Sequence, residues 1–310
     1  MTLAARPEVR HAYEHHHLAA HRWQDFAVRD GDVVISTSYK TGTTWMQTIV
    51  GHLIFHETGL PASINELSPW LDMRVFPEAE MKAALAAQQH QRFIKTHLPL
   101  DGLPWHEQVR YVVVGRDPRD VFMSLLNHWG THTAEFYTVM NEHSGNPGDA
   151  FPRMPEDPHE VWRNWITRGS FPWETDGWPY WSHLHHCASW WAFRHLPNIA
   201  FFHYGDMLED LEREMRRVAD FIGVEVPETR WPELVDACRF ASMKENASRL
   251  LGDMSFAFKG GNDTFLNRGT NGRWRELLDE EELELYRDAI ARTLPPGCAR
   301  WLEAGGPVRA

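Results

Sequence analysis

Short hydrophobic runs recur along the chain between longer segments of mixed polarity. Asp32-Val-Val-Ile-Ser36 has the length of a buried strand, and Trp45 to Phe55, which lacks breakers except Gly51, is long enough for a helix. The short apolar pattern returns at 92–95, at 110–115 and at 198–203. These runs predict four strands, each followed by a loop or a helix.

Two further helices are predicted after these strands. Residues 120–127 follow the 110–115 run, with Asp120 as a plausible N-cap, and residues 209–223 end at Gly223, a good C-cap residue. Strands that alternate with helices imply a P-loop-like α/β fold of three layers, with a central, mostly parallel sheet between helices. Ligands of such sheets bind beyond the carboxyl ends of the strands.

The domain organisation follows from the absence of repeats and from one change of texture. Residues 129–185 are rich in Pro, Gly and Trp, with little periodicity, which is typical of a lid, and their aromatic content argues against disorder. We therefore expect one domain over 1–310, with an aromatic-rich acceptor or lid segment at about 129–185.

Composition excludes several classes of protein. The chain has 31 Lys and Arg against 43 Asp and Glu, a net charge of −12 with no basic block, which argues against nucleic-acid binding. We find no apolar run of membrane-spanning length and no signal-like start. Cys187, Cys238 and Cys298 are far apart, which predicts neither a disulfide framework nor a Cys-rich zinc site. We expect a cytoplasmic protein without integral membrane association.

Three segments carry candidate chemistry. Ser38-Tyr-Lys-Thr-Gly-Thr-Thr-Trp45 combines a turn-forming Gly42, the charge of Lys40 and a following helix N-terminus, as an anion cradle requires, although Lys40 precedes the only glycine, unlike in a standard P-loop. Lys95-Thr-His-Leu-Pro99 places a cation and an imidazole at a strand end. In 116–124, Arg116 and Ser124 are both within plausible reach of a phosphate.

In this order the segments resemble the cytosolic-type sulfotransferases, which transfer a sulfonate group from 3′-phosphoadenosine 5′-phosphosulfate (PAPS) to a hydroxyl or amine and release PAP. Tyr204-Gly-Asp-Met207, Phe240 to Asn246, and Asn267-Arg-Gly-Thr-Asn-Gly-Arg-Trp274 are similar to three further segments of that family. The resemblance covers most of the chain and implies a bacterial-type member of the family.

The resemblance assigns roles to individual residues. It implies His97, Lys40 and Lys95 as catalytic residues, with His97 as the general base. It implies that the nucleotide is bound by Lys40, Thr41, Gly42, Thr43, Thr44, Trp45, Arg116, Ser124, Tyr204, Phe240, Arg268 and Gly269. Two positions depart from the family pattern. Asn267 stands where the glycine-rich segment 267–274, the late loop, usually has a cation, and Cys238 stands where the family often has a hydroxyl residue.

The chemistry supports these roles independently. An imidazole can accept the proton of an attacking hydroxyl, Lys40 with the loop amides suits the leaving-group side, and Lys95 suits the sulfonate or the acceptor. No metal is required, because fixed donors can hold a phosphosulfate, unlike a nucleoside triphosphate. The expected acceptor is a small-molecule or lipid-like hydroxyl compound, namely an apolar or aromatic alcohol, a phenol or a glycolipid.

Several alternatives stay open at this point. A P-loop-type nucleotide kinase would use Asp117 for magnesium, and a catalytically silent nucleotide-binding module would keep the fold alone. Metal binding is conceivable at His15-His-His17, which we expect to be a solvated segment, or at His183-Leu-His-His-Cys187. The protein is a monomer or a homodimer. Trp70, residues 129–185 and the Trp190-Trp191 pair are expected around the acceptor, where nine of the 15 tryptophans fall.

Overall fold

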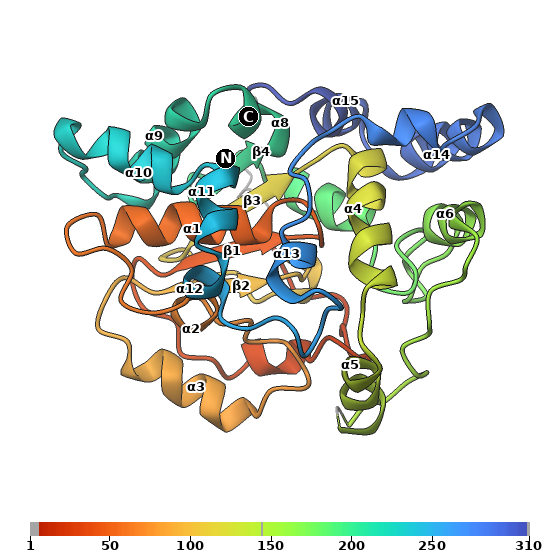
Figure 1. Ribbon diagram of the computed structural model, residues 1–310, viewed down its shortest axis with the longest axis horizontal. Coiled ribbons are helices and arrows are strands. Elements are labelled where there is room, and N and C mark those ends of the chain that lie inside the picture. The colour runs from red at the N-terminus through yellow and green to blue at the C-terminus, as the bar shows by residue number, and fades with distance from the viewer. Residues whose placement is uncertain (1–5, 144, 309–310) are drawn as a thin grey trace.

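A central parallel sheet organises the chain. The computed structural model describes residues 6–143 and 145–308. The four strands lie in the order β2-β1-β3-β4 (Figure 1), and every neighbouring pair is parallel. Their bounds are β1 Val33–Thr37, β2 Phe93–Thr96, β3 Arg110–Gly115 and β4 Ile199–His203. All four predicted strands are therefore confirmed, three of them with ends shifted by one residue.

Helices account for most of the remaining regular structure. The α-helices are α1 Thr43–Ile54, α2 Ile64–Leu67, α3 Glu78–Ala87, α4 Pro118–Gly130, α5 Ala134–Thr138, α6 Pro158–Thr167, α7 His183–Trp191, α8 Tyr204–Glu209, α9 Leu211–Ile222, α10 Trp231–Ala237, α11 Phe240–Glu245, α12 Ala247–Leu251, α13 Gly261–Phe265, α14 Glu280–Thr293 and α15 Pro296–Ala304. Short 3-10 turns lie at Ala20–Trp23, Leu100–Gly102, Glu228–Arg230 and Arg273–Glu276, and a π turn at Val139–His143. The α/β class is confirmed.

The sheet separates two hydrophobic cores, because successive side chains of a strand point to opposite faces. Val33 and Ile35 pack with α1, α9 and α10 on one face. Val34 packs into the core of the other face, to which α4, α6, α7, α14 and α15 contribute. Both faces are thus covered, and the carboxyl ends of the strands remain as the place for a ligand.

Two helix ends test the predicted caps. The α9 helix ends at Gly223 with φ 74°, the left-handed conformation that glycine adopts without strain, as predicted. The N-cap of α4 is Asp117 and not Asp120, because the Asp117 side chain accepts from the Arg119 backbone N–H. Pro118 can then occupy the first turn, where its missing N–H costs nothing. Asp120 instead accepts from the Gly272 backbone N–H at 2.6 Å.

The segment 129–185 is more regular and more deeply packed than its composition suggested. It contains α5 and α6, and Trp162 and Trp165 on one face of α6 are fully buried. The Asp176 side chain accepts the His183 and Leu184 backbone N–H groups at 3.1 and 3.2 Å and so caps α7. Much of this acceptor or lid segment is therefore part of the core, while its residues 132–140 and 180–181 contribute to the cavity described below.

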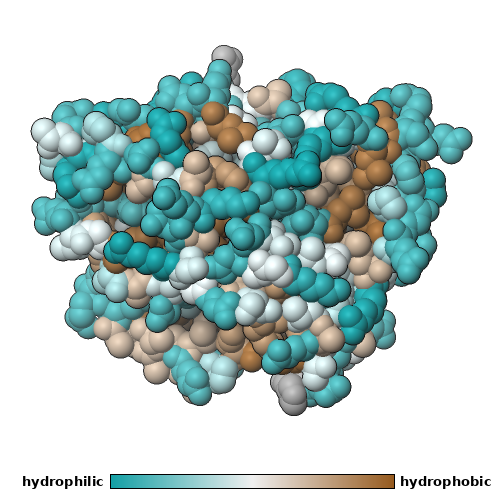
Figure 2. Space-filling model, in the orientation of Figure 1, coloured by the Kyte–Doolittle hydropathy of each residue, from teal (hydrophilic) through white to brown (hydrophobic). Residues whose placement is uncertain are grey.

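The face shown in Figure 2 is mostly hydrophilic. Hydrophobic residues gather on it mainly in the lower part of the view and on the right, between α4 and α6, without forming a continuous belt. In residues 6–143 and 145–308, no helix combines the length and the hydropathy that crossing a bilayer would need.

Candidate active site

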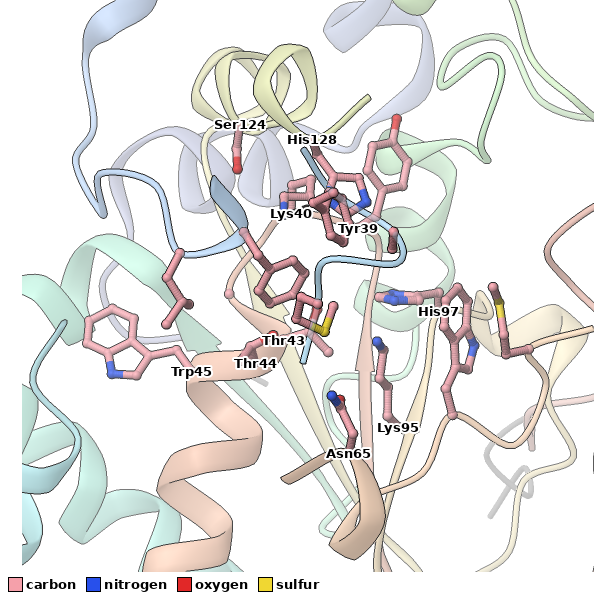
Figure 3. Close-up of a pocket in the computed structure, with 18 of the residues that line it drawn as sticks. Tyr39, Lys40, Thr43, Thr44, Trp45, Asn65, Lys95, His97, Ser124 and His128 are labelled. Atoms are coloured by element: carbon pink, nitrogen blue, oxygen red, sulfur yellow. Dashed lines mark hydrogen bonds between the residues drawn. The ribbon is translucent and has the colours of Figure 1, made fainter. Parts of the chain in front are cut away.

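One cavity of about 1010 Å³ lies where the four strands end. Each strand delivers a side chain to it: Lys40 follows β1, His97 follows β2, Arg116 follows β3 and Tyr204 follows β4. In Figure 3, Trp45 and Ser124 lie toward one end, and Lys95 and His97 lie close together toward the other. Parallel topology therefore assembles residues that are far apart in the sequence.

The loop after β1 is shaped by two unusual backbone conformations. Lys40 has φ 60° and Gly42 has φ 114°. A Cβ atom on Gly42 would lie 2.9 Å from Cδ2 of Tyr204, so only glycine fits there without displacing that ring. The α1 helix begins at Thr43 and points its free N–H groups and positive dipole end toward the cavity.

Not every predicted loop residue reaches the cavity. Lys40, Gly42, Thr43, Thr44 and Trp45 line it, whereas Thr41 does not. Thr41 is fully buried, and its hydroxyl has no hydrogen-bond partner in the part of the chain that the structure describes. The Thr41 side chain thus does not reach the cavity, and a role of this residue in nucleotide binding stays a prediction.

Two histidines of α7 brace this loop from behind. His186 Nε2 lies 2.9 Å from Ser36 Oγ, and His183 Nδ1 is hydrogen-bonded to Ser38 Oγ. His183 Nε2 also lies 3.1 Å from the Arg116 carbonyl oxygen, so this ring bridges the loops that follow β1 and β3. The cluster 183–187 is thus structural and does not gather as a metal site among the described residues.

His97 is held by its inner ring nitrogen. Nδ1 lies 2.9 Å from the Thr37 carbonyl oxygen and also contacts the Ser38 carbonyl. Carbonyl oxygens only accept, so Nδ1 carries the proton and Nε2 presents a lone pair. Burial, together with Lys95 and Lys40, holds the His97 pKa well below its usual value, so the ring is neutral. His97 can therefore accept a proton at Nε2.

Two lysines flank this histidine. Lys40 Nζ lies 3.2 Å from His128 Nδ1, and Lys95 Nζ lies 4.5 Å from the centre of the Trp70 ring. Burial, with Lys95 and Arg116 nearby, lowers the Lys40 pKa to about 7, and burial lowers the Lys95 pKa to about 8. Among the described residues, neither amine is in direct contact with a carboxylate. Both positive charges are therefore available to bind an anion.

The far end of the cavity is lined by arginines. The Arg116 guanidinium stacks 4.0 Å from the Tyr204 ring centre and donates to Asn271 Oδ1 at 2.8 Å. Arg268 and Gly269 also line the cavity, as does Ser124 of α4. Arg273 also lines this end, and its buried Nε has no partner among the described residues. It thus supplies a further cation to the same end of the cavity, where Asn267 also lies.

An aromatic pair lies beside these cations. Trp45 and Phe240 both line the cavity, as predicted. Trp45 Nε1 donates to the Cys238 carbonyl oxygen at 2.8 Å, which fixes the indole. Cys238 itself is fully buried and does not line the cavity, so the thiol is no contact for a ligand here. A Cβ on Gly269 would lie 2.7 Å from the Phe240 ring.

The other end of the cavity, beside His97, is walled by rings, and we call it the aromatic chamber. It is lined by His17, Tyr39, Trp70, His128, His132, Phe136, Tyr180, Trp181 and Phe258. The family motifs do not include His17, His128 or His132. His132 lies in the 129–185 segment that we expected around the acceptor, whereas His17 was noted only as part of a candidate metal segment.

The expected concentration of tryptophans around the acceptor is wrong for most of them. Of the nine, all in the described part of the chain, Trp70 and Trp181 line the cavity. Trp129, Trp162, Trp165 and Trp190 are fully buried core residues, and the Trp190-Trp191 pair is packed away from it. Burial of a large aromatic side chain is strongly stabilising, which explains why these tryptophans lie in the core.

The segment His15-His-His17 is also unlike its expectation. All three rings are buried, so the prediction of a solvated segment is wrong. Among residues 6–143 and 145–308, the only grouping with metal-like spacing is His159, Asp279 and Glu282, where Asp279 and Glu282 already form the capping box of α14. Neither histidine segment is therefore a metal site in this conformation.

The fold and the cavity define a class of enzyme in which a glycine-containing basic loop and a histidine at a strand end line the same cavity. The model of the sulfotransferase domain family matches residues 30–295, and the chain belongs to this family. It is a sulfotransferase. Asp117, which the kinase alternative would use to bind magnesium, instead accepts a hydrogen bond from Arg119 Nη2 at 2.7 Å.

Relatives agree with this assignment. A glycolipid sulfotransferase of Mycobacterium bovis (strain BCG / Pasteur 1173P2) is 33% identical over 298 residues, covering 92% of this chain and 91% of the relative. Sulfotransferase 1A1 of Rattus norvegicus is 26% identical, with 87% of each chain covered. The solved structure of retinol dehydratase with androsterone and PAP has a TM-score of 0.66 at 24% identity, covering 89% of this chain and 84% of that one, and supports the fold.

Proposed function

We propose that the protein transfers the sulfonate group of PAPS to a hydroxyl of a small apolar or aromatic alcohol, a phenol or a glycolipid. The observation that carries this proposal is the meeting of Lys40, Lys95 and the free Nε2 of His97 in one cavity. Three solved structures with this fold contain PAP, and mycobacterial relatives are named glycolipid sulfotransferases.

The residues at the arginine end fit the donor nucleotide. Arg116, Arg268 and Arg273 offer cations suited to a 3′-phosphate, and arginine forks match phosphate oxygens well. The Trp45 and Phe240 rings suit a flat base, and the open backbone at Gly42 and the α1 N-terminus suit the phosphosulfate. The unpaired Nε of Arg273 is the kind of buried donor that a phosphate would satisfy.

When bound, PAPS supplies an activated sulfonate on a phosphate leaving group. His97 Nε2 accepts the proton of the acceptor hydroxyl, and its Nδ1–H bonds to the strand carbonyls keep the ring oriented. Lys40 and the α1 amides stabilise negative charge on the leaving side, and Lys95 stabilises charge on the transferred oxygens. The acceptor oxygen bonds to sulfur in line as the bond from sulfur to the phosphate oxygen breaks.

The proposal is tested by incubating the protein with PAPS labelled in its sulfonate and a panel of alcohols, phenols and glycolipids. Label in an acceptor sulfate ester, with PAP formed in equal amount and without loss on addition of EDTA, is the expected result. Release of inorganic sulfate alone, or transfer only when a divalent metal is added, would contradict it. Calorimetric titration with PAP, run beside this assay, separates nucleotide binding from turnover.

A further inference from the structure

The aromatic chamber contains three imidazoles that the proposed chemistry does not use. His17 and His132 are each 3% exposed, and His128 projects from α4 next to Lys40 (Figure 3). Burial is the main cause that lowers the pKa of each of these three rings, to about 3 in His132. All three are therefore neutral, and each ring offers one N–H donor and one acceptor nitrogen.

A count of hydrogen-bond partners separates these rings. His132 is fully satisfied, because Nδ1 lies 3.2 Å from the Ala257 carbonyl oxygen and Nε2 lies 3.2 Å from the Tyr180 hydroxyl. His17 Nδ1 lies 2.6 Å from His16 Nδ1, and His128 Nδ1 is engaged by Lys40. The Nε2 atoms of His17 and His128 have no hydrogen-bond partner among residues 6–143 and 145–308.

These open nitrogens lie around the space beside His97. His17 and His97 pack against the same indole, with ring centres 6.2 and 5.2 Å from that of Trp181. His17 and His128 likewise flank Tyr180, at 5.3 and 6.4 Å. An acceptor that presents one hydroxyl to His97 therefore has its neighbouring atoms near the two unsatisfied imidazoles.

His17 and His128 line the cavity, and their Nε2 atoms are open to it, so a ligand that displaces water there must bond these atoms or leave them unsatisfied. A hydroxyl is the matching group, because it donates and accepts and so fits either tautomer of a neutral imidazole. We propose that His17 and His128 form a hydroxyl-recognition subsite, and that the natural acceptor is polyhydroxylated, with a sugar-like ring whose additional hydroxyls bond these imidazoles. This inference rests on the proposed function, since it assumes transfer at His97.

The test compares two acceptors with the same tail and a six-membered ring. Octyl β-D-glucoside carries several hydroxyls, and 4-(octyloxy)cyclohexanol carries one. With PAPS as donor, we expect kcat/KM for the glucoside to exceed that for the mono-alcohol by at least about tenfold, because a site built to bond a hydroxyl rejects an analogue that lacks it. This ratio is measured on the unaltered protein and so does not depend on a variant that folds.

Variants then assign the preference to a residue. His17→Phe removes an open nitrogen and should reduce the ratio by about tenfold or more, whereas His17→Gln, which keeps polar atoms, should retain part of it. His195→Phe is the matched control, because this exposed histidine lies outside the cavity, and the ratio should stay within about twofold. PAP binding checks that each variant is folded.

The outcomes separate this inference from the function on which it rests. Equal kcat/KM for both acceptors, or a ratio that His17→Phe leaves unchanged, overturns the subsite, while transfer itself upholds the proposed function. Transfer to phenols and mono-alcohols but not to the glucoside has the same meaning. Failure to sulfonate any hydroxyl compound overturns the proposed function and this inference together.

Discussion

The two ends of the cavity differ in how they treat charge. The arginine end gathers cations on loops that follow β1 and β3 and on the late loop, with Arg116, Arg268 and Arg273 facing one space. The aromatic chamber, at the other end of the same cavity, is instead lined by neutral imidazoles and uncharged rings. One end is thus built for a polyanion, and the other for a neutral molecule.

We infer from this difference that the proposed transfer takes place at the border between the two ends. Lys40 and Lys95 lie there, and burial lowers the pKa of each toward neutrality, to about 7 and about 8. His97 is adjacent and neutral. An enzyme that joins an anion to a neutral hydroxyl needs such a border, because charge must be stabilised on one side only. The ends should therefore respond oppositely to pH.

The largest effect that we expect is a loss of stability in acid, caused by buried histidines in and around the aromatic chamber. Burial lowers the pKa of His16 and His132 to about 3, and that of His183 to about 4, from about 6.5 in the unfolded chain. The unfolded state takes up these protons first as the pH falls below 6.5. Stability should therefore fall by about 1.4 kcal/mol per pH unit for each histidine, about 4 kcal/mol per unit for the three.

Urea unfolding followed by circular dichroism between pH 7.5 and 5 measures this slope. His16→Gln should remove about one histidine's share of this slope. A typical domain has about 5–15 kcal/mol of stability, so unfolding is expected near pH 5. A stability that is flat over this range would contradict neutral burial of the imidazoles.

How much of this border was predictable from sequence depends on how local each signal is. The loop 38–45 was recognised because a strand, a turn and a helix follow one another within a few residues, and His97 because it follows a short apolar run. Of the chamber, only Trp70 and the part formed by residues 129–185 were expected, since His17 comes from the N-terminal segment, His128 from α4 and Phe258 from a loop after α12. Their meeting depends on tertiary packing that no local period encodes.

The fold itself was more accessible than the fate of individual side chains. Apolar runs identified all four strands, because a strand buried on both faces is apolar throughout. The same pattern could not tell a core tryptophan from a pocket tryptophan, so Trp162 and Trp181 were grouped together. Nor could it show that Asp117, one turn before Asp120, caps α4.

The second prediction concerns the neutral side of the border. His97→Ala removes the group that accepts the proton, so turnover should fall by at least about 100-fold. PAP affinity, measured by calorimetry, should stay within about threefold, since the arginine end is untouched. The matched control is His195→Ala, an exposed histidine outside the cavity, which should leave both unchanged. Near-normal turnover of the His97 variant would overturn its role as general base.

The third prediction concerns the charged side and has the opposite pH dependence. The pKa of Lys40 is about 7 in the free protein, and a bound anion raises it, so nucleotide binding takes up a proton. PAP affinity should therefore fall as the pH rises above about 7.5, where phosphates are already ionised, by at most about tenfold per pH unit for this lysine.

Calorimetry in buffers of different ionisation enthalpy counts the protons taken up. Lys40→Ala should lower that number and flatten the pH dependence. Lys82→Ala on α3, whose Nζ is paired with Glu78 at 2.7 Å, should do neither. Proton release on PAP binding at pH 8 would show that Lys40 does not contact the anion.

The smallest effect tests whether the arginine end is already complete. Asn267 stands where related loops carry a cation, yet Arg273 lines the same region and Lys244 Nζ lies 3.5 Å from the Asn267 carbonyl oxygen. Asn267→Arg should therefore raise PAP affinity by only about two- to fivefold, because a half-exposed charge is screened by water and repelled by its basic neighbours. Gln108→Arg, an equal charge change near the amino end of β3, is the control and should leave affinity unchanged. A gain of about 100-fold would contradict this expectation, because it would show that Arg273 does not replace the missing cation at the arginine end.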